Sequence, residues 1–371
     1  MRPGAWQRLD HLQPLLVGML AVLGLMTVYS AHADWVRQLM WLALGTAAYV
    51  AAAAFDYRRL LPLAPWLYVA TLGLLLAVRL VGHSALGAQR WLSIGGFPLE
   101  PSELSKLTLV LVLAAYLSRR DKVSWRAFVG ALGLVAPAAA LILTQPDLGT
   151  TIVVIAVLAG MLFLAGARFA QLGSLAACAA VALPLLPHLL HGYQRRRLEI
   201  FLNPSSDPLG AGYNLLQARI AVGAGGLFGQ GWLHGLQGAL GFVPERATDF
   251  VFAVFAEQFG LLGCLLLLAL FGMLLIRLLH SAAVAPDSFG RLLACGVFVM
   301  ILAQVVENVG MNIGLLPIAG IPLPLISYGG SATMTTLAAL GLVQSVTLRR
   351  PLLEHGDSGG WSGNITLRAQ A

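Results

Sequence analysis

The stretch FVPERATDFVFAVF, residues 242–255, takes the chain from a polar interval into a long apolar run. Glu245, Arg246 and Asp249 lie within five residues at this boundary. Ionisable groups at the edge of a membrane are costly unless they are paired or functional, so Asp249 is a candidate for the functional site. The alternative is that Asp249 only caps the following helix, by accepting hydrogen bonds from its first N–H groups.

The composition on both sides of this stretch is that of a membrane protein. Of the 371 residues, 58% are hydrophobic and 11% are charged, whereas soluble domains contain about 25% charged residues. The net charge of +7 is spread between apolar runs, which argues against nucleic-acid binding and is typical of topology signals. Neither a Walker loop nor a dinucleotide-binding motif occurs. Cys178, Cys264 and Cys295 lie in apolar runs without CxxC spacing, so no disulfide or metal ligand is predicted.

About 20 apolar residues are enough to cross a bilayer as a helix. The predicted spans are 12–31, 35–54, 63–81, 104–118, 128–144, 149–166, 170–190, 250–277, 289–313 and 331–348. The fold class is therefore an all-α integral membrane protein with about ten transmembrane helices. The first span resembles a signal peptide, but its length and its continuation into further spans favour a retained helix.

Basic residues between the spans predict the orientation. The N-terminal segment and the loops on one side contain Arg2, Arg8, Arg58, Arg59, Arg119, Arg120, Lys122, Arg126, Arg168, Arg277, Arg291, Arg349 and Arg350. The short opposite loops 32–34 and 145–148 contain no Lys or Arg. Short basic loops stay in the cytoplasm, so both termini are predicted to be cytoplasmic. The segments 82–103, 191–249 and 314–330 then face outward, the second as a large loop between helices seven and eight, on a side without ATP.

Charged and capping residues lie near the starts of the fourth and sixth spans. Lys106 lies one turn inside the fourth span and must pair or bind an anion, and Glu103 is its nearest partner on the same helical face. Ser102, after Pro101, is predicted to cap that helix. Asp147 at the tight reversal before the sixth span is either a helix cap or a functional carboxylate.

Polar residues also continue into the later spans. Gln304, Glu307, Asn308 and Asn312 lie on one side of the ninth span and must face protein or water. Glu257, eight residues after Asp249, is expected to point the same way. In the outer loop, 214–222 is predicted to form a short amphipathic helix with Gln217 and Arg219. The basic run 195–197 is suited to phosphate groups.

The last outer segment resembles the signature of the SEDS family (shape, elongation, division, sporulation), which includes RodA, FtsW and SpoVE. The similar stretch is NVGMNIGLLPIAGIPLPLISYGGSA at 308–332. Further similar runs are GAQRW at 87–91, PSELSK at 101–106, QPDLGT at 145–150, DPLGAGY at 207–213 and PERATDF at 244–250. The last two look more like RodA, although Ala247 stands where RodA proteins often have His. A single domain is expected over 1–354, and the tail 355–371 matches no family motif and is expected to be disordered.

The resemblance implies a peptidoglycan glycosyltransferase that joins lipid II units outside the bacterial cytoplasmic membrane during cell elongation. It also implies a class B penicillin-binding protein as partner, alongside membrane lipid. Asp249 matches the family's essential acidic residue and is assigned as base or metal ligand, with Mg²⁺ or Mn²⁺ left open. Substrate contacts are expected from Arg246, Arg219, Arg197, Arg90, Lys106, Trp91, Gln217 and Ser327, supported by Glu103, Glu257 and Glu245.

Two other functions fit the same architecture. A flippase for lipid II would need polar groups through the whole membrane thickness, whereas the ionisable residues gather at the outer boundary. A scaffold that only holds the penicillin-binding protein would not need Asp249. The residues rank the enzyme first, the flippase second and the scaffold third.

Overall fold

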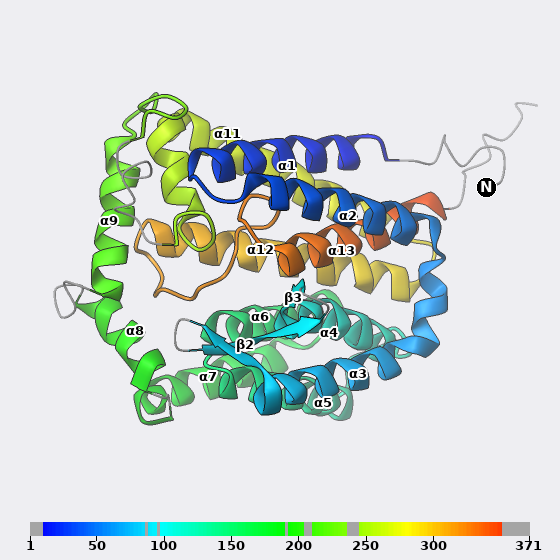
Figure 1. Cartoon of the computed structure of the whole chain (residues 1–371). Helices are drawn as coiled ribbons and strands as arrows, with labels where there is room; N and C mark the ends of the chain where they lie inside the picture. The colour runs from blue at the N-terminus through cyan, green and yellow to red at the C-terminus, as the bar shows by residue number, and fades with distance from the viewer. Residues whose placement is uncertain are drawn as a thin grey trace, which may run out of the picture.

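Long helices lie side by side in the computed structural model, and two shorter helices lie across one end of them (Figure 1). The structure describes residues 10–85, 88–94, 97–189, 192–203, 210–235 and 245–350. The tail 355–371 lies outside the described residues, and the single domain over 1–354 stays a prediction.

Every predicted span coincides with a helix, so the all-α membrane fold class is confirmed. The helices are α1 Leu12–Ser30, α2 Trp35–Ala54, α3 Leu60–Val81, α4 Pro101–Leu117, α5 Trp125–Thr144, α6 Leu148–Leu164, α7 Phe169–Leu189, α11 Val251–Ala283, α12 Ser288–Asn312 and α13 Gly330–Leu348. Within the described residues, six helical segments are both long and apolar enough to cross a membrane. The number of spans and the orientation stay predictions.

Helix α11 runs six residues beyond the expected end at 277. The guanidinium of Arg277 pairs with the carboxylate of Asp10 at 2.9 Å, so this charge is neutralised within the bundle. A paired arginine does not interrupt helical hydrogen bonding, and the helix continues.

Three short strands, which were not predicted, lie in the predicted outer segment 83–99. Strands β1 His83–Ala85, β2 Ala88–Ile94 and β3 Phe97–Leu99 form an antiparallel sheet in the order β1-β2-β3. Leu92 pairs with Leu99 and Ile94 with Phe97. The segment is too short and too polar to span a membrane, and pairing between its own strands satisfies its backbone groups.

The polar interval contains two further helices. Helix α9 (Ala211–Ala224) contains the predicted helix 214–222 and confirms it. Helix α8 (Gly192–Leu202) includes the arginine run and was not predicted. In Figure 1, α8 and α9 cross the ends of the long helices, at the same end as the start of α11.

Helix α11 is interrupted at Gly260, where φ is 64°. The segment 225–231 pairs with the interruption through its backbone: Gln230 donates its N–H to the Glu257 carbonyl at 2.9 Å, and Leu261 donates to the Gly226 carbonyl at 2.9 Å. A Cβ on Gly260 would lie 2.3 Å from the backbone N of Gly229, so only glycine fits. The interruption separates a half-helix, 251–259, whose first residues adjoin Asp249.

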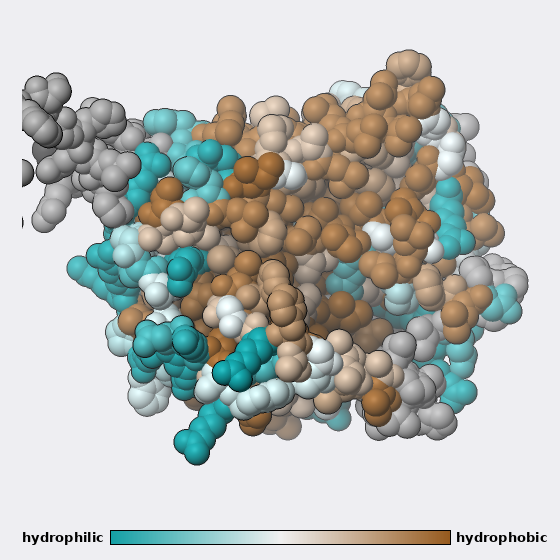
Figure 2. Space-filling view, turned by 180° about the vertical axis from the view of Figure 1, so that it is seen from behind, coloured by the Kyte–Doolittle hydropathy of each residue, from teal (hydrophilic) through white to brown (hydrophobic). Residues whose placement is uncertain are grey.

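Apolar side chains cover the outside of the long helices, whereas hydrophilic residues gather toward their ends (Figure 2). Leu80, Leu266 and Ile276 are among the exposed apolar residues. The predicted polar side of α12 faces inward, since Gln304, Glu307, Asn308 and Asn312 are all at most 4% exposed. An apolar exterior around buried polar groups is the arrangement expected of a multi-pass membrane protein.

Candidate functional site

A cavity of about 260 Å³ lies where the three segments predicted to face outward meet. Its walls come from α2 (Arg37, Trp41), β2 (Arg90, Trp91), the start of α4 (Glu100, Glu103), α8 (Arg197), the turn 245–249 and the segment 320–332. Segments distant in sequence therefore build one polar cavity.

Asp249 points its carboxylate into this cavity and does not cap α11. The N-cap residue of α11 is Phe250, and no side chain accepts a capping hydrogen bond there, so the capping alternative is wrong. Instead, the backbone carbonyl of Asp249 accepts hydrogen bonds from Nδ2 of Asn308 at 3.0 Å and from Nδ2 of Asn312 at 3.1 Å. Two amides of α12 thus fix the backbone that carries the carboxylate.

Arg197 is the cation beside Asp249. A Cβ built on Gly320 would lie 3.2 Å from Nη1 of Arg197 and 3.3 Å from Oδ2 of Asp249, so both side chains approach the same glycine. Nη1 of Arg197 also donates to the Ile318 carbonyl at 3.2 Å. Gly320 has φ of 74°, which suits a residue without a side chain.

The pKa of the Asp249 carboxyl is raised to about 6, chiefly because the group is buried; the Arg197 guanidinium opposes this rise and Glu245 adds to it. At neutral pH the carboxylate is therefore mostly ionised, yet it is more basic than an exposed aspartate. A carboxylate in this state can accept a proton from a bound hydroxyl group.

Arg90 and Asp147 form a second charged pair in the cavity region. Nη2 of Arg90 donates to the Pro146 carbonyl at 2.7 Å, and Nη1 lies 3.7 Å from Oδ1 of Asp147. The same Oδ1 accepts the N–H of Thr150 at 3.1 Å. Asp147 therefore caps α6, as one of its two predicted roles required, and also orients Arg90 at the wall.

Lys106 and Glu103 form the expected pair, with Nζ 2.7 Å from Oε1. Both side chains are buried, and Glu103 reaches the cavity wall. The prediction that Ser102 caps α4 is wrong. Pro101 takes the first helical position, where its missing N–H costs nothing, so the cap position falls on Glu100.

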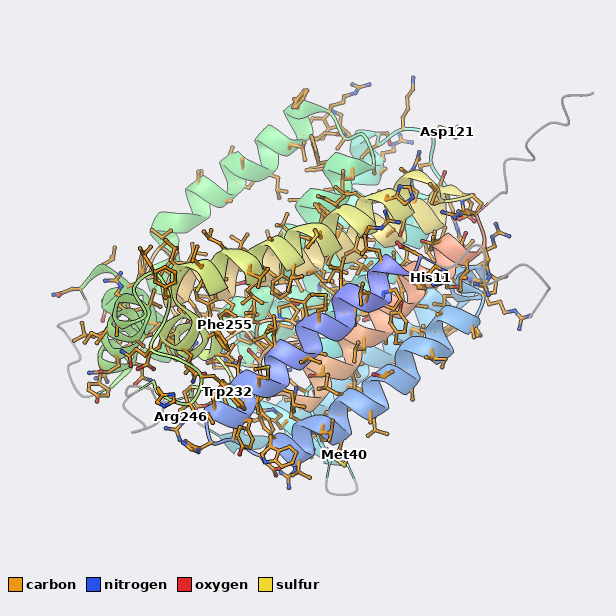
Figure 3. All side chains as sticks on the ribbon, turned by 90° about the horizontal axis from the view of Figure 1, so that it is seen from above. His11, Met40, Asp121, Trp232, Arg246 and Phe255 are labelled. Carbon is orange, nitrogen blue, oxygen red and sulfur yellow. The ribbon has the colours of Figure 1, made fainter. Side chains whose placement is uncertain are left out.

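Several predicted substrate-binding residues do not line the cavity. Arg246 donates its Nε to the Ala31 carbonyl at 2.7 Å, and Figure 3 shows it near Trp232 at the end of α1. Arg219 donates to the Gly314 carbonyl at 2.8 Å. Gln217 lies on α9, away from the residues of the wall. Their substrate roles stay predictions.

Ser327 and Glu257 are buried in structural positions outside the cavity wall. The hydroxyl of Ser327 donates to the Thr248 carbonyl at 2.6 Å and accepts the Leu323 N–H at 2.8 Å. It therefore holds the segment 320–328 against the turn that contains Asp249. Glu257 is fully buried, and its carboxylate lies against Gly235, so it does not share the direction of Asp249. Glu257 lies next to the interruption of α11, and there its carboxylate faces the segment 225–235.

Of the other predicted residues, Trp91 and Glu245 line the cavity. Sequence reasoning missed Arg37, Trp41, Glu100 and Tyr328 as wall residues. The sequence predicted that Asn308 and Asn312 lie on the polar side of α12, but it did not predict that they bind the Asp249 backbone.

The site offers few side chains that could bind a metal ion. Within the part of the chain that the structure describes, no three His, Cys, Asp or Glu side chains cluster as a ready-made metal site. Asp249 with Glu245 beside it supplies carboxylate oxygens, so a cation here would need further oxygens from a bound ligand.

Comparison with known proteins places the chain in one family. Residues 11–351 match the family model of FtsW, RodA and SpoVE, described as a cell cycle protein. Peptidoglycan glycosyltransferase MrdB of Escherichia coli K12 is 41% identical over 362 residues, which cover 94% of this chain and 96% of that protein.

Two solved structures are similar in fold. A chain from a peptidoglycan synthase complex, described as coordinating polymerization and crosslinking, is 36% identical with a TM-score of 0.81, covering 92% of this chain and 98% of that one. The crystal structure of Thermus thermophilus rod shape determining protein RodA is 32% identical with a TM-score of 0.70, covering 92% and 97%. The chain is a multi-pass membrane protein that belongs to the FtsW, RodA and SpoVE family, the SEDS family.

Proposed function

We propose that this chain is a peptidoglycan glycosyltransferase that joins lipid II units into glycan strands, with the cavity at Asp249 as its active site. The observation that supports the proposal most strongly is the Asp249 carboxylate. It is free of a capping role, its backbone is fixed by two asparagines, and it faces a cavity beside Arg197. Relatives over nearly the whole chain are named peptidoglycan glycosyltransferases.

The reaction needs a base and a stabiliser of the leaving group. A sugar hydroxyl of the acceptor attacks the anomeric carbon of the donor, forming one C–O bond while the bond to the diphosphate breaks. Asp249 takes the hydroxyl proton, and the diphosphate leaves with the bonding electrons. The pKa of about 6 suits this step, because the carboxylate is ionised at neutral pH but still accepts a proton. Arg197 stabilises the charge that develops on the diphosphate.

The location of the cavity agrees with this chemistry. Most of its lining residues come from the segments predicted to face outward. No ATP is needed there, because cleavage of the polyprenyl diphosphate bond drives the transfer. The protein would then act at the outer face of the bacterial cytoplasmic membrane during cell elongation.

We also propose that a divalent cation, Mg²⁺ or Mn²⁺, accompanies the diphosphate. Mg²⁺ is commonly held by one or two carboxylates together with substrate phosphates, and Asp249 with Glu245 provides that share. The cation would supply charge neutralisation for the leaving diphosphate. Chelation with EDTA should lower the polymerisation rate and Mg²⁺ should restore it, whereas an unchanged rate would contradict a cation.

The partner is proposed to be a class B penicillin-binding protein that cross-links the new strands. The support is the similarity in fold to a chain of a peptidoglycan synthase complex. No residue of this chain is assigned to the contact.

The test compares wild type with Asp249→Asn and Asp249→Ala, each co-purified with the partner, in polymerisation of purified lipid II. Long glycan strands from wild type and none from folded, partner-bound variants would support the enzyme. Equal polymerisation by all three would place the chemistry elsewhere. Transfer of lipid II across liposomes without polymerisation would favour the flippase, and an inactive wild type with an intact partner complex would favour the scaffold.

A further inference from the structure

Glu100 is a carboxyl of the cavity that the proposed reaction does not use. Its backbone N–H donates to Oγ of Ser331 at 3.0 Å, which ties the start of α4 to the start of α13. Oγ of Ser102 donates to Oε1 of Glu100 at 3.1 Å. Within the described residues, this is the one hydrogen bond to the Glu100 carboxyl, so Oε2 is available to a ligand in the cavity.

Two tryptophans, Trp41 and Trp91, line the same cavity as Glu100. Strands β2 and β3 pair Leu92 with Leu99, so Trp91 and Glu100 are the next residues along the two segments in this antiparallel register. Trp41 packs on Gly330, since a Cβ there would lie 2.6 Å from its ring. Gly330 precedes Ser331, which holds Glu100. We call Glu100, Ser331, Trp41 and Trp91 the glutamate corner.

The glutamate corner differs in charge from the surroundings of Asp249. Glu103 and Asp147 are the strongest acidic neighbours of Glu100, and Arg90 and Lys106 oppose them. The strongest charged neighbours of Asp249 are Arg197 and Glu245, whereas Arg90 and Asp147 act on both carboxyls.

This difference separates the preferred ligands of the two regions. A diphosphate is attracted by Arg197. It gains no such attraction from the Glu100 carboxyl, and the nearby Lys106 is already paired with Glu103. A carboxyl accepts hydrogen bonds from hydroxyl groups, and aromatic rings offer a flat apolar surface with specific geometry. A sugar ring matches both kinds of group, because it has hydroxyl groups around its edge and C–H groups on a flat face.

We propose that the glutamate corner is a carbohydrate subsite, which binds an amino sugar of the substrate while the diphosphate lies at Arg197. The proposal rests on the proposed function and deepens it. Burial, together with Glu103, raises the pKa of the Glu100 carboxyl. Near neutral pH it is therefore protonated in part of the molecules, and it can donate as well as accept a hydrogen bond.

The test measures binding of two ligands to the full chain with its partner in nanodiscs. Lipid II carries both sugars, whereas undecaprenyl diphosphate carries none. The variants are Glu100→Ala and the nearly isosteric Glu100→Gln, which keeps an amide for hydrogen bonding. The matched control is Glu199→Ala on α8, which removes an exposed carboxylate that pairs only with Arg195 at 2.9 Å among the ion pairs of the described residues.

Glu100→Ala should weaken lipid II binding about tenfold, the loss typical of a hydrogen bond to a charged group. Its binding of undecaprenyl diphosphate should stay within about twofold of wild type. Glu100→Gln should show a smaller loss, also confined to lipid II. In polymerisation, the KM for lipid II should rise more than kcat falls, and Glu199→Ala should match wild type in every measurement.

Equal weakening of both ligands in the two Glu100 variants would overturn the subsite, because Glu100 would then act on the fold or on the diphosphate. Unchanged lipid II binding would overturn it as well. Melting temperature and retention of the partner show whether Glu100→Ala is folded, and Glu100→Gln decides if it is not. A wild type that neither binds nor polymerises lipid II would instead overturn the proposed function, and the subsite with it.

Discussion

Replacement of Gly320 by alanine tests whether the separation of Arg197 and Asp249 matters for activity. Gly320 has φ of 74°, in the region that side chains disfavour, and this alone costs about 1 to 2 kcal/mol of stability. The new Cβ would lie 3.2 Å from Nη1 of Arg197 and 3.3 Å from Oδ2 of Asp249. Both groups must move by a few tenths of an ångström. Because small displacements of catalytic groups lower the reaction rate steeply, we expect the polymerisation rate to fall by about 10- to 100-fold.

Gly166→Ala is the matched control. Gly166 has φ of 83°, and nothing lies within 4 Å of a Cβ built there. Its backbone cost is the same, but it follows α6 far from the lining residues. The assay is strand synthesis from lipid II, with melting temperatures of both variants. Similar melting temperatures with a rate loss confined to Gly320→Ala are expected. Equal rate losses in both variants, or full activity of Gly320→Ala, would refute the reasoning.

Three further predictions follow from the same contacts. The polymerisation rate should rise with pH up to about 6 and then level off, because Asp249 must lose its proton to act as base; a pH-rate profile that is flat from 5 to 7 would contradict this. Asp249→Asn should melt at a higher temperature than wild type at pH 7.5 but not at pH 4. In the folded wild type, the pKa of Asp249 lies above the ordinary value of about 4, so the charged carboxylate costs stability. The stability of the wild type therefore falls as pH rises from about 4 to about 6. Equal melting temperatures of the two proteins at pH 7.5 would argue against a desolvated carboxylate. Lys106→Met should destabilise the fold by about 3 to 5 kcal/mol, since it leaves the Glu103 carboxylate buried without its partner, and Lys106→Met with Glu103→Leu should recover much of that loss in thermal unfolding.

Apolar length made the helices predictable from sequence. Spans such as 35–54 and 331–348 reappear almost residue for residue, because a helix that satisfies its own backbone is the simplest structure for such a run. The hairpin at 83–99 was not predicted. Its longest strand has seven residues, and short strands among polar residues give a weak periodic signal.

The site was predicted in part, and the errors came from using distance along the chain. Arg246 was predicted to contact substrate because it is three residues from Asp249, yet its guanidinium donates to the Ala31 carbonyl and does not line the cavity. Arg197, on another helix, approaches the same glycine as Asp249. Glu100 was overlooked because its place in the cavity depends on strand pairing and on Ser331, which is distant in sequence. Such contacts form when folding brings distant segments together, and the spacing of residues along the chain does not reveal them.

The break at Gly260 mechanically isolates the reactive end of α11 from the rest of the helix. The half-helix 251–259 is anchored at its start, where Asn312 accepts the Ala253 N–H at 3.1 Å, and at its end by backbone pairing with the segment 225–231. The remaining part of α11 exposes Leu265, Leu266 and Ile276, an apolar surface suited to contact with lipid. Changes in membrane thickness that tilt this part can be absorbed at the glycine. We therefore expect the position of Asp249 to depend little on the thickness of the surrounding lipid.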